Sequence, residues 1–434
     1  MADTADTPAP SYGAALQLQV RRARAFSDVE QSLPAVSQHR SFFADAFSSP
    51  LDEAKARTMA GTLRRAAAEL LSHLGPWNPK PLPVEDGSVV WLLDNTAFRA
   101  GSGDGTWKAE FVTAVFAPRR SLGVADAATN IARRLGIEDG AAEIEIIHQR
   151  LLPFVLAIQP GRLVEIEFAG RADVALGPCG RNGISSDVKM VPEAGTGRVV
   201  ESVAKGLPAD VTGLLRMKTA FAEEKGWAVI SDIDDTIKIT QTSDPIGILA
   251  STFVDEPTPV AGMPELYGHM HKLLTAAAPF FYLSASPYNL YSFLRSFRDA
   301  HYPYGQLVLR DASWQSIPGL LSNLTLGTQE YKVSRMRKMH DWLPGRSMIC
   351  IGDSTQTDPE SYGEIYRSYP AWVHLILIRK VTNVAEVGLD DKNAPERFEK
   401  AFDGVPRSVW HIFEDPKECI GILDRLVGSA KTTA

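Results

Sequence analysis

Residues 227–236 read Trp-Ala-Val-Ile-Ser-Asp-Ile-Asp-Asp-Thr, an apolar run that ends in two carboxylates placed two residues apart. A short apolar run of this kind predicts a strand buried on both faces, as in a parallel α/β sheet. Side chains at positions i and i+2 of a strand point the same way, so Asp232 and Asp234 can face one ligand. Open α/β sheets bind their ligands at the carboxyl ends of the strands. The stretch therefore predicts a phosphoryl-transfer site, where a divalent metal or a shared proton relieves the repulsion between the carboxylates.

Further polar groups follow two other apolar runs of the chain. Residues 280–283 end in Ser284, and residues 348–351 end in a Gly-Asp-Ser sequence that contains Asp353. Lys332 lies between them, at the start of a segment with apolar residues at helical spacing. Because each group follows a predicted strand or begins a predicted helix, all of them can converge on one sheet edge. An Asp-rich stretch by itself is also consistent with a plain surface turn, and these additional groups favour a site.

The ordered set of motifs resembles that of the haloacid dehalogenase phosphatases: two aspartates at the first strand, a serine or threonine at the second, then a lysine, and an acidic motif last. In more detail, the fungal actin-patch phosphatidate phosphatase family, App1, has a catalytic domain similar to residues 232–238, 282–290 and 352–360. The similarity extends over about residues 225–415, and residues 91–97 resemble the amino-terminal region of the same family more weakly. The resemblance implies a phosphatase.

The resemblance also implies a role for each residue of the motifs. Asp232 would attack phosphorus and form an aspartyl phosphate, while Asp234 would act as general acid to the leaving oxygen and then as base to water. Thr236 and Ser284 would donate hydrogen bonds to phosphoryl oxygens. Lys332 would balance the charge that accumulates on them.

A magnesium ion is the cofactor that the resemblance implies. Mg²⁺ prefers an octahedral set of oxygen ligands and keeps several waters. Asp232, the backbone carbonyl of Asp234, and Asp353 would supply the protein's share. Asp358 would complete the acidic metal site by orienting a metal-bound water or Lys332. None of the nine histidines shows the spacing of a metal site.

Several neighbouring polar residues have a second interpretation. Ser286 is an alternative to Ser284 as the phosphate contact, and Ser284 is favoured because it directly ends the apolar run. Asp235 and Thr240 are interpreted as structural, as caps of a helix or of a flap. Asp94, which precedes an Asn and a Thr, is interpreted as the cap of a turn rather than as a ligand.

The length of 434 residues exceeds what one hydrophobic core normally organises, so we expect several domains. Residues 85–215 are expected to form an accessory, mainly antiparallel β domain. Residues 216–434 are expected to form an α/β catalytic domain of the haloacid dehalogenase type, with a Rossmann-like parallel sheet, helices on both faces and a minimal cap. In the β domain, alternating and apolar runs predict strands at residues 89–93, 107–115, 162–169 and 199–203, with a helix near 126–135.

Residues 1–84 are expected to be a disordered start, a helical segment and a connector. The composition of residues 1–13 predicts disorder. Ser49 and Pro50 would begin a helix that ends before Gly75. The proline-rich residues 76–83 can serve as a linker or as a ligand of SH3 proteins, and the linker is favoured.

Composition and charge exclude several classes of protein. A content of 44% hydrophobic and 22% charged residues is typical of globular domains, and the three cysteines form no disulfide framework. No stretch approaches the roughly 20 apolar residues of a membrane span, and the acidic start differs from a signal peptide. A formal net charge of −7 gives no overall attraction to nucleic acid. We therefore expect a cytoplasmic protein. The resemblance implies that it is peripheral at membranes or at cortical actin patches.

The substrate expected from the resemblance is phosphatidate at a membrane surface. Only about 45 residues separate the first motif from the second, and about as many separate the second from the lysine, which excludes a substantial lid domain. An open site suits an anchored substrate. Trp314 is a candidate for membrane contact, although burial in the core is equally consistent. Arg21, Arg22 and Arg24 can form a local basic patch or a solvated helix face.

Three functions remain open at this point. The first is a magnesium-dependent lipid phosphatase that converts phosphatidate to diacylglycerol. The second keeps this chemistry but acts on a phosphoprotein or a soluble phosphate ester. The third is an actin-patch adaptor that binds partners through the β domain and the proline-rich segment. A full set of catalytic residues argues against a pure adaptor, and the sequence does not separate the first two.

Overall fold

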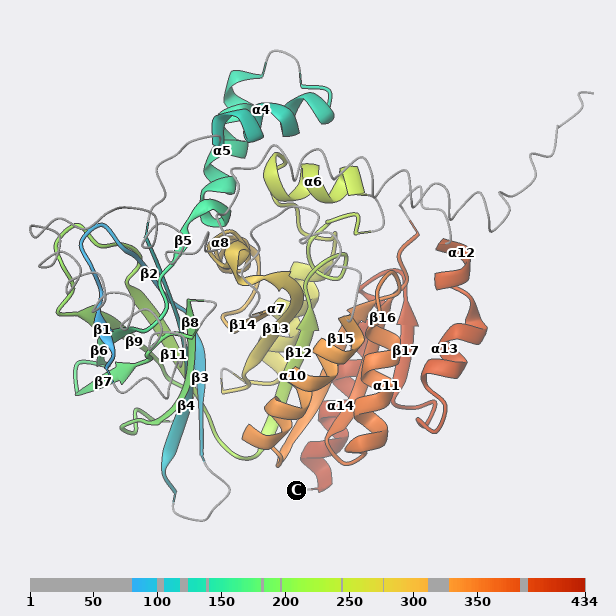
Figure 1. Cartoon of the computed structure of the whole chain (residues 1–434). Coiled ribbons are helices and arrows are strands. Elements are labelled where there is room, and N and C mark those ends of the chain that lie inside the picture. The colour runs from blue at the N-terminus through green and yellow to red at the C-terminus, as the bar shows by residue number, and fades with distance from the viewer. Residues whose placement is uncertain are drawn as a thin grey trace, which may run out of the picture.

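The computed structural model describes residues 80–433, apart from residues 100–104, 118–123, 138–139, 181–182, 196, 243–244, 276, 311–327 and 383–388. Two β-sheets lie side by side in the described part of the chain (Figure 1). The first sheet is drawn in blue and green, and the second, which helices surround, runs from yellow-green to red. The protein is therefore of the α/β class, with the second sheet built in the part of the chain that carries the motifs.

The second sheet has six described strands, all parallel, in the order β14-β13-β12-β15-β16-β17. These strands are β12 (Gly226–Asp232), β13 (Phe280–Pro287), β14 (Gln306–Arg310), β15 (Arg346–Asp353), β16 (Val373–Arg379) and β17 (Trp410–Phe413). The chain adds β13 and β14 on one side of β12 and then crosses to add β15, β16 and β17 on the other. The carboxyl ends of β12 and β15 therefore form a switch point, the place where such sheets bind ligands.

Helices follow the strands of the second sheet and cover both of its faces. They are α6 (Pro245–Phe253), α7 (Met263–Leu273), the 3₁₀-helix η2 (Tyr288–Leu290), α8 (Tyr291–His301), α10 (Thr328–Trp342), α11 (Asp358–Ser368), α12 (Leu389–Lys392), α13 (Pro395–Ala401) and α14 (Glu418–Thr433). In β12, Val229 belongs to one hydrophobic cluster, and its neighbours Ala228 and Ile230 belong to another. Helices α6, α7, α8 and α14 line the first cluster, while α10, α11 and α13 line the second. The predicted parallel sheet with helices on both faces is confirmed.

The first sheet has eleven described strands and is mainly antiparallel, with parallel pairs between β1 and β6, β2 and β10, and β3 and β11. Its strands are β1 (Leu82–Pro83), β2 (Val89–Leu92), β3 (Asn95–Arg99), β4 (Trp107–Ala117), β5 (Ala157–Ile158), β6 (Arg162–Phe168), β7 (Ala172–Leu176), β8 (Ile184–Met190), β9 (Val199–Lys205), β10 (Thr212–Leu214) and β11 (Arg216–Ala222). The four strands predicted from the sequence correspond to β2, β4, β6 and β9. The sheet continues to Ala222, beyond the expected boundary at residue 215, because β11 pairs with β3 and β9.

Two helices interrupt the first sheet between β4 and β5. Helix α4 (Val124–Arg134) is the predicted one, whereas α5 (Ala141–Val155) was not predicted. Helix α5 contains Pro153 two residues before its end, and proline usually argues against a helix. Both helices contribute buried residues to the hydrophobic cluster that also lines the second sheet. They therefore belong to the packed core.

The interpretation of Asp94 as a local turn cap is wrong. Its carboxylate is fully buried and accepts a hydrogen bond from the backbone N–H of Lys218, at 2.8 Å, on β11. The same carboxylate forms an ion pair with Arg298 on α8, at 3.1 Å. Asp94 thus joins the two sheets, through partners that lie more than a hundred residues away in sequence.

Some expectations fall outside the described residues: the disordered start, the helix between Ser49 and Gly75, the first part of the connector, the arginine patch and Trp314. Among the helices that the structure does describe, none combines the length and the hydrophobicity that crossing a bilayer requires. Cys179, Cys350 and Cys419 are all buried and unpaired. Burial raises the pKa of Cys179 to about 12, so this thiol is unreactive.

Candidate active site

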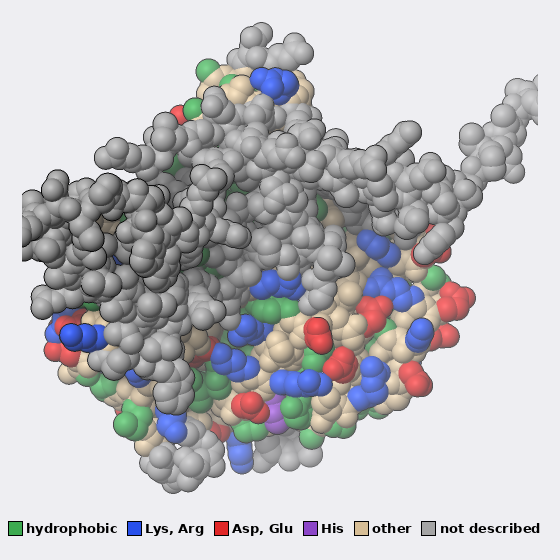
Figure 2. Space-filling model, in the orientation of Figure 1, with side chains coloured by type: hydrophobic (Ala, Val, Ile, Leu, Met, Phe, Trp, Pro, Cys, Tyr) green, Lys and Arg blue, Asp and Glu red, His purple; other side chains and the backbone are tan. Residues whose placement is uncertain are grey.

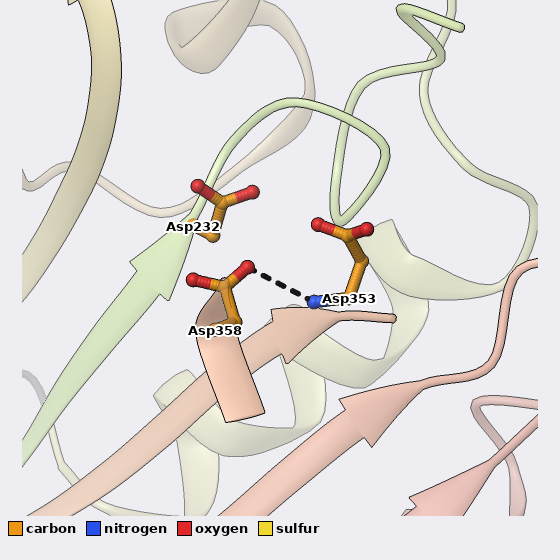
Figure 3. A group of neighbouring side chains, drawn as sticks. All are labelled: Asp232, Asp353 and Asp358. Atoms are coloured by element: carbon orange, nitrogen blue, oxygen red, sulfur yellow. Dashed lines mark hydrogen bonds between the residues drawn. The ribbon is translucent and has the colours of Figure 1, made fainter. Parts of the chain in front are cut away.

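The motif residues meet at the carboxyl ends of β12 and β15. Asp232 is the last residue of β12 and Asp353 the last of β15, while Asp358 begins helix α11 beside them. Figure 3 shows the three carboxylates converging on one point between the two strand ends. The carboxylate of Asp358 accepts a hydrogen bond from the backbone N–H of Asp353, at 3.2 Å. The predicted convergence on one sheet edge is therefore present.

A glycine allows Asp358 to approach this closely. A Cβ atom on Gly352 would lie 2.5 Å from the Cβ of Asp358, far inside van der Waals contact. Any larger residue at position 352 would force Asp358 and the start of α11 away from the strand end. The Gly-Asp sequence at 352–353 thus has a steric reason as well as a chemical one.

The three carboxylates are close enough to bind one cation. One oxygen from each of Asp232, Asp353 and Asp358 lies within 4.8 Å of the others, and all three side chains are buried. Lys332 on α10 is also buried, and its Nζ donates to Asp232 at 2.6 Å and to Asp358 at 2.5 Å. The cluster thus contains one ammonium group and three carboxylates. The site has more negative than positive charge when all of its groups are ionised.

The pKa values of these groups reflect that imbalance. Burial, together with the charge of Asp358, raises the pKa of Asp232 well above its usual value. Burial and the charge of Asp358 likewise raise the pKa of Asp353, to about 8. Burial alone would lower the pKa of Lys332, but the carboxylates of Asp232 and Asp358 outweigh burial and raise it. An additional positive charge at this point would stabilise the ionised carboxylates.

Hydroxyl groups hold the carboxylates of the site in place through hydrogen bonds. Thr236 Oγ1 lies 3.0 Å from Asp232 Oδ2 and 3.4 Å from Asp353 Oδ2, so it bridges the two strand ends. The backbone N–H and the hydroxyl of Thr355 both donate to Asp353 Oδ1. Asp232 is thus held on both oxygens, by Lys332 on one and by Thr236 on the other. In this structure the Thr236 hydroxyl contacts carboxylates.

Asp234 lies apart from the acidic cluster and has its own set of partners. Its Oδ2 accepts hydrogen bonds from Ser284, at 2.7 Å, and from Ser286, at 3.2 Å. Its Oδ1 accepts a hydrogen bond from Thr240, at 2.9 Å. The Asp234 side chain is not a member of the group of three carboxylates. Its backbone carbonyl, the expected metal ligand, lies 3.4 Å from the Nε2 of Gln356.

Comparison with known proteins agrees with this geometry. Residues 227–380 match the sequence model of the family described as phosphatidate phosphatase APP1, catalytic domain. The segment that carries the site is therefore similar to an APP1 catalytic domain. The chain is also similar to the phosphatidate phosphatase APP1 of Saccharomyces cerevisiae, with 29% identity over 166 residues. That region covers 38% of this chain and 27% of the yeast protein, so the match spans just over a quarter of this curated relative.

The loop that follows β12, residues 233–242, is called the motif loop here, and Asp235 holds it in shape. This residue has a positive φ of 59°, which L-residues other than glycine rarely adopt. Its carboxylate accepts hydrogen bonds from the backbone N–H groups of Thr240, Gln241 and Thr242, at 2.7 to 2.9 Å. The interpretation of Asp235 as a structural residue is confirmed. Its contacts fold the loop back, so that Thr240 reaches Asp234.

Sequence reasoning did not predict all of the contacts that Thr240, Ser286 and Thr355 make at the site. Thr240 was interpreted only as structural and Ser286 only as a competitor of Ser284, yet both contact Asp234. Spacing offered a signal for Ser286, because residues i and i+2 of a strand share a face. No such signal existed for Thr240, whose position depends on the loop that Asp235 closes. Thr355 follows the acidic motif, where a hydroxyl can bond back to the preceding aspartate.

Proposed function

We propose that this chain is a magnesium-dependent phosphatidate phosphatase that releases diacylglycerol and phosphate through an aspartyl phosphate on Asp232. The observation that carries the proposal is the meeting of Asp232, Asp353, Asp358 and Lys332 at the switch point of a parallel sheet, within the segment that matches the APP1 family. Phosphoryl transfer needs a nucleophile, a proton donor and positive charge around the phosphate. The described residues can provide the nucleophile and the proton donor. They can also hold positive charge beside the phosphate.

The surroundings of Asp232 suit a nucleophile. Lys332 and Thr236 fix the rotation of its carboxylate, so the attacking oxygen has a defined direction. Attack on phosphorus forms the bond from Asp232 to the phosphoryl group and releases the lipid alkoxide. The Lys332 ammonium then faces the phosphoryl oxygens and offsets their charge. A water molecule hydrolyses the aspartyl phosphate in the second half of the reaction.

The surroundings of Asp234 suit a group that first gives and then takes a proton. Its three side-chain partners, Thr240, Ser284 and Ser286, are all hydroxyls. A hydroxyl donates to a carboxylate and can accept from a carboxylic acid, so the same three contacts hold Asp234 in either protonation state. Asp234 can therefore protonate the leaving oxygen of the alcohol and later accept a proton from water without changing its place.

The donor set fits a hard divalent cation such as Mg²⁺. Among the described residues, Asp232, Asp353 and Asp358 bring carboxylate oxygens together. The resemblance adds the backbone carbonyl of Asp234 as a ligand, and Asp358 would orient a coordinated water. Burial and the neighbouring carboxylate of Asp358 raise the pKa values of Asp232 and Asp353, and a bound cation would stabilise their ionised forms. When bound, the ion would screen the carboxylates and polarise the substrate phosphate.

Two observations support a substrate anchored in a membrane. The family and the yeast relative are both described as phosphatidate phosphatases. Between the first two motifs, α6 and α7 are short, and both contribute buried side chains to the cluster on the sheet, which supports a haloacid dehalogenase fold with a minimal cap. Figure 2 shows basic and acidic side chains interspersed over the described surface of the catalytic half, so contact with an anionic bilayer would be local.

The test is a phosphate-release assay with three substrates: phosphatidate in mixed micelles, a soluble chromogenic phosphate ester and a phosphopeptide. We expect the rate on phosphatidate to depend on its surface mole fraction in the micelle more than on its bulk concentration. Preference for the soluble ester or the phosphopeptide would establish the second function in place of the first. Release of phosphate from none of them would leave the actin-patch or SH3 adaptor, whose proline-rich segment lies half outside the described residues.

A further inference from the structure

The two serines that hold Asp234 lie where pairing within the second sheet is interrupted. β13 pairs with β12 as far as Leu283, and its register against β14 shifts between Leu283 and Pro287. Ser284 and Ser286 lie inside this shift. A register shift removes the regular ladder of backbone hydrogen bonds at the residues that it contains. The position of the serines therefore depends on the residues that follow them.

The next residues of the chain are held by the first sheet. The ring of Tyr288 stacks on Phe116 of β4, with centroids 5.9 Å apart, and meets the edge of Trp91 of β2 at 6.4 Å. The side-chain amide of Asn289 donates to the backbone carbonyl of Pro153 in α5, at 2.9 Å. Both residues are buried. The 3₁₀-helix η2, which follows the serines directly, is thus fixed by β2, β4 and α5.

Helix α8 provides a second anchor on the same sheet. Tyr291, Arg295 and Arg298 lie on one face of this helix, at positions i, i+4 and i+7. The backbone N–H of Asp94 donates to Tyr291 Oη at 2.7 Å. The Asp94 carboxylate forms ion pairs with Arg295 at 3.3 Å and with Arg298 at 3.1 Å. Because Asp94 lies between β2 and β3 and is also bonded to Lys218, it ties α8 to this connection and to β11.

The other end of α8 reaches the motif loop. The hydroxyl of Tyr302, the residue after α8, donates to the backbone carbonyl of Ile237 at 2.7 Å. Phe293 of α8 lies under the buried ammonium of Lys238, which in turn donates to Thr240 at 3.1 Å. One helix therefore contacts the motif loop and also continues directly from η2, which follows Ser284 and Ser286.

We infer that the first sheet is a clamp that positions Ser284, Ser286 and the motif loop around Asp234, with Asp94 and Tyr288 as its positioning residues. The catalytic part of this inference rests on the proposed phosphatase function, whereas the contact between the sheets does not. The first sheet, with Asp94, lies outside the segment that matches the APP1 family, residues 227–380, whereas Tyr288 lies inside it. A loosened clamp leaves the acidic cluster in place but misplaces the hydroxyls on Asp234. The rate of the chemical step should therefore fall more than the affinity for the substrate.

Two variants test the clamp in the full chain. Asp94→Asn keeps the size of the side chain but removes the charge that pairs with Arg298, and Tyr291→Phe removes only the acceptor for the Asp94 N–H. On a soluble phosphate ester, we expect kcat to fall on the order of tenfold for the first and about threefold for the second, with KM nearly unchanged. Amide hydrogen exchange in residues 283–291 should become faster in both variants.

The matched control is Phe98→Leu. Phe98 also joins the first sheet to the second half, by stacking on Trp342 with centroids 5.4 Å apart. Trp342 ends α10 ten residues after Lys332, about 15 Å along the helix, so this contact is remote from Asp234. We expect this variant to lower the thermal midpoint while leaving kcat and exchange in residues 283–291 as in the wild type.

The results separate three cases. If Asp94→Asn and Phe98→Leu alter kcat and exchange alike at equal loss of thermal stability, the clamp is only a general stabilising contact and the inference fails. It also fails if exchange in residues 283–291 stays unchanged in Asp94→Asn and Tyr291→Phe. If the wild type hydrolyses no phosphate ester, the proposed function fails, and local exchange still decides whether the first sheet holds the serine segment.

Discussion

The strands β13 and β8 illustrate how differently the two sheets distribute polar residues. β13, in the second sheet, is buried at every position, whereas β8, in the first sheet, starts with two buried residues and then alternates between exposed and half-buried ones. A polar side chain on β8 can face water at little cost. A polar side chain at the end of β13 has to find a partner inside the protein. Polar residues are therefore informative about function in the second sheet and much less so in the first.

Replacement of the buried carboxylates should have the largest effect, and it tests the contrast between polar residues of the two sheets most severely. Asp232→Asn removes the nucleophile, so turnover should fall by a factor of at least about 10⁴ and no phosphoenzyme should form. Asp234→Asn should still form a phosphoenzyme from a substrate with a good leaving group, because only protonation and hydrolysis are impaired. Rapid quench with a radiolabelled ester measures both. Equal phosphoenzyme yields from the two variants would contradict the assigned roles, and thermal melts confirm that each variant is folded.

Removal of divalent metal should have the next largest effect. We expect EDTA to abolish turnover and excess Mg²⁺ to restore it, because the close carboxylates cannot approach a phosphate dianion unscreened. Saturation with Mg²⁺ at 100 times its Kd should also stabilise the fold by about 2.7 kcal/mol. In Asp353→Asn this thermal shift should be much smaller, which provides a measurement independent of activity. Full turnover in EDTA would rule out the metal assignment.

Replacing either of the two serines at the end of β13 should have a smaller effect on kcat. Comparing the two replacements shows which polar side chain of this buried strand matters more to Asp234. Ser284 is the closer partner of Asp234, at 2.7 Å against 3.2 Å for Ser286. Loss of one hydrogen bond to a charged group costs about 1.5–3 kcal/mol. We therefore expect kcat to fall about tenfold or more in Ser284→Ala and less in Ser286→Ala. A larger effect of Ser286→Ala in steady-state assays would reverse the preference for Ser284.

The smallest effect on stability is expected for a substitution at a solvent-exposed position of the first sheet. Val188 of β8 is 52% exposed, so Val188→Ser should change the free energy of unfolding by no more than about 0.5 kcal/mol. Phe281 of β13 is fully buried, and Phe281→Ala should cost about 3–5 kcal/mol. Urea unfolding of both variants measures the difference. Similar losses in the two would show that the sheets are less different than their burial patterns indicate.

The strands and site residues that could be predicted from the sequence are those that depend on neighbouring residues in the chain. β12, β13 and β15 could be located because a strand covered on both faces needs an uninterrupted apolar run. Asp232, Ser284 and Asp353 could be assigned because they end such runs. The role of Asp94 could not be predicted, since its partners Lys218 and Arg298 are brought to it only by the packing of the two sheets. The first sheet also ends later than expected, because pairing with β3 and β9 decides the place of β11.

The hydrophobic cluster that contains Trp91, Phe116 and Phe154 from the first half also contains Tyr288 and Val229 from the second. One continuous core should melt in one step, so calorimetry of the full chain should show a single cooperative transition. The family boundaries at residues 227 and 380 do not enclose a folding unit. A fragment cut there would lose β17 and α14, and it would expose Tyr288, Tyr291 and Arg298 where the first sheet now covers them. For expression work, the shortest independently stable piece of this protein should begin before β1.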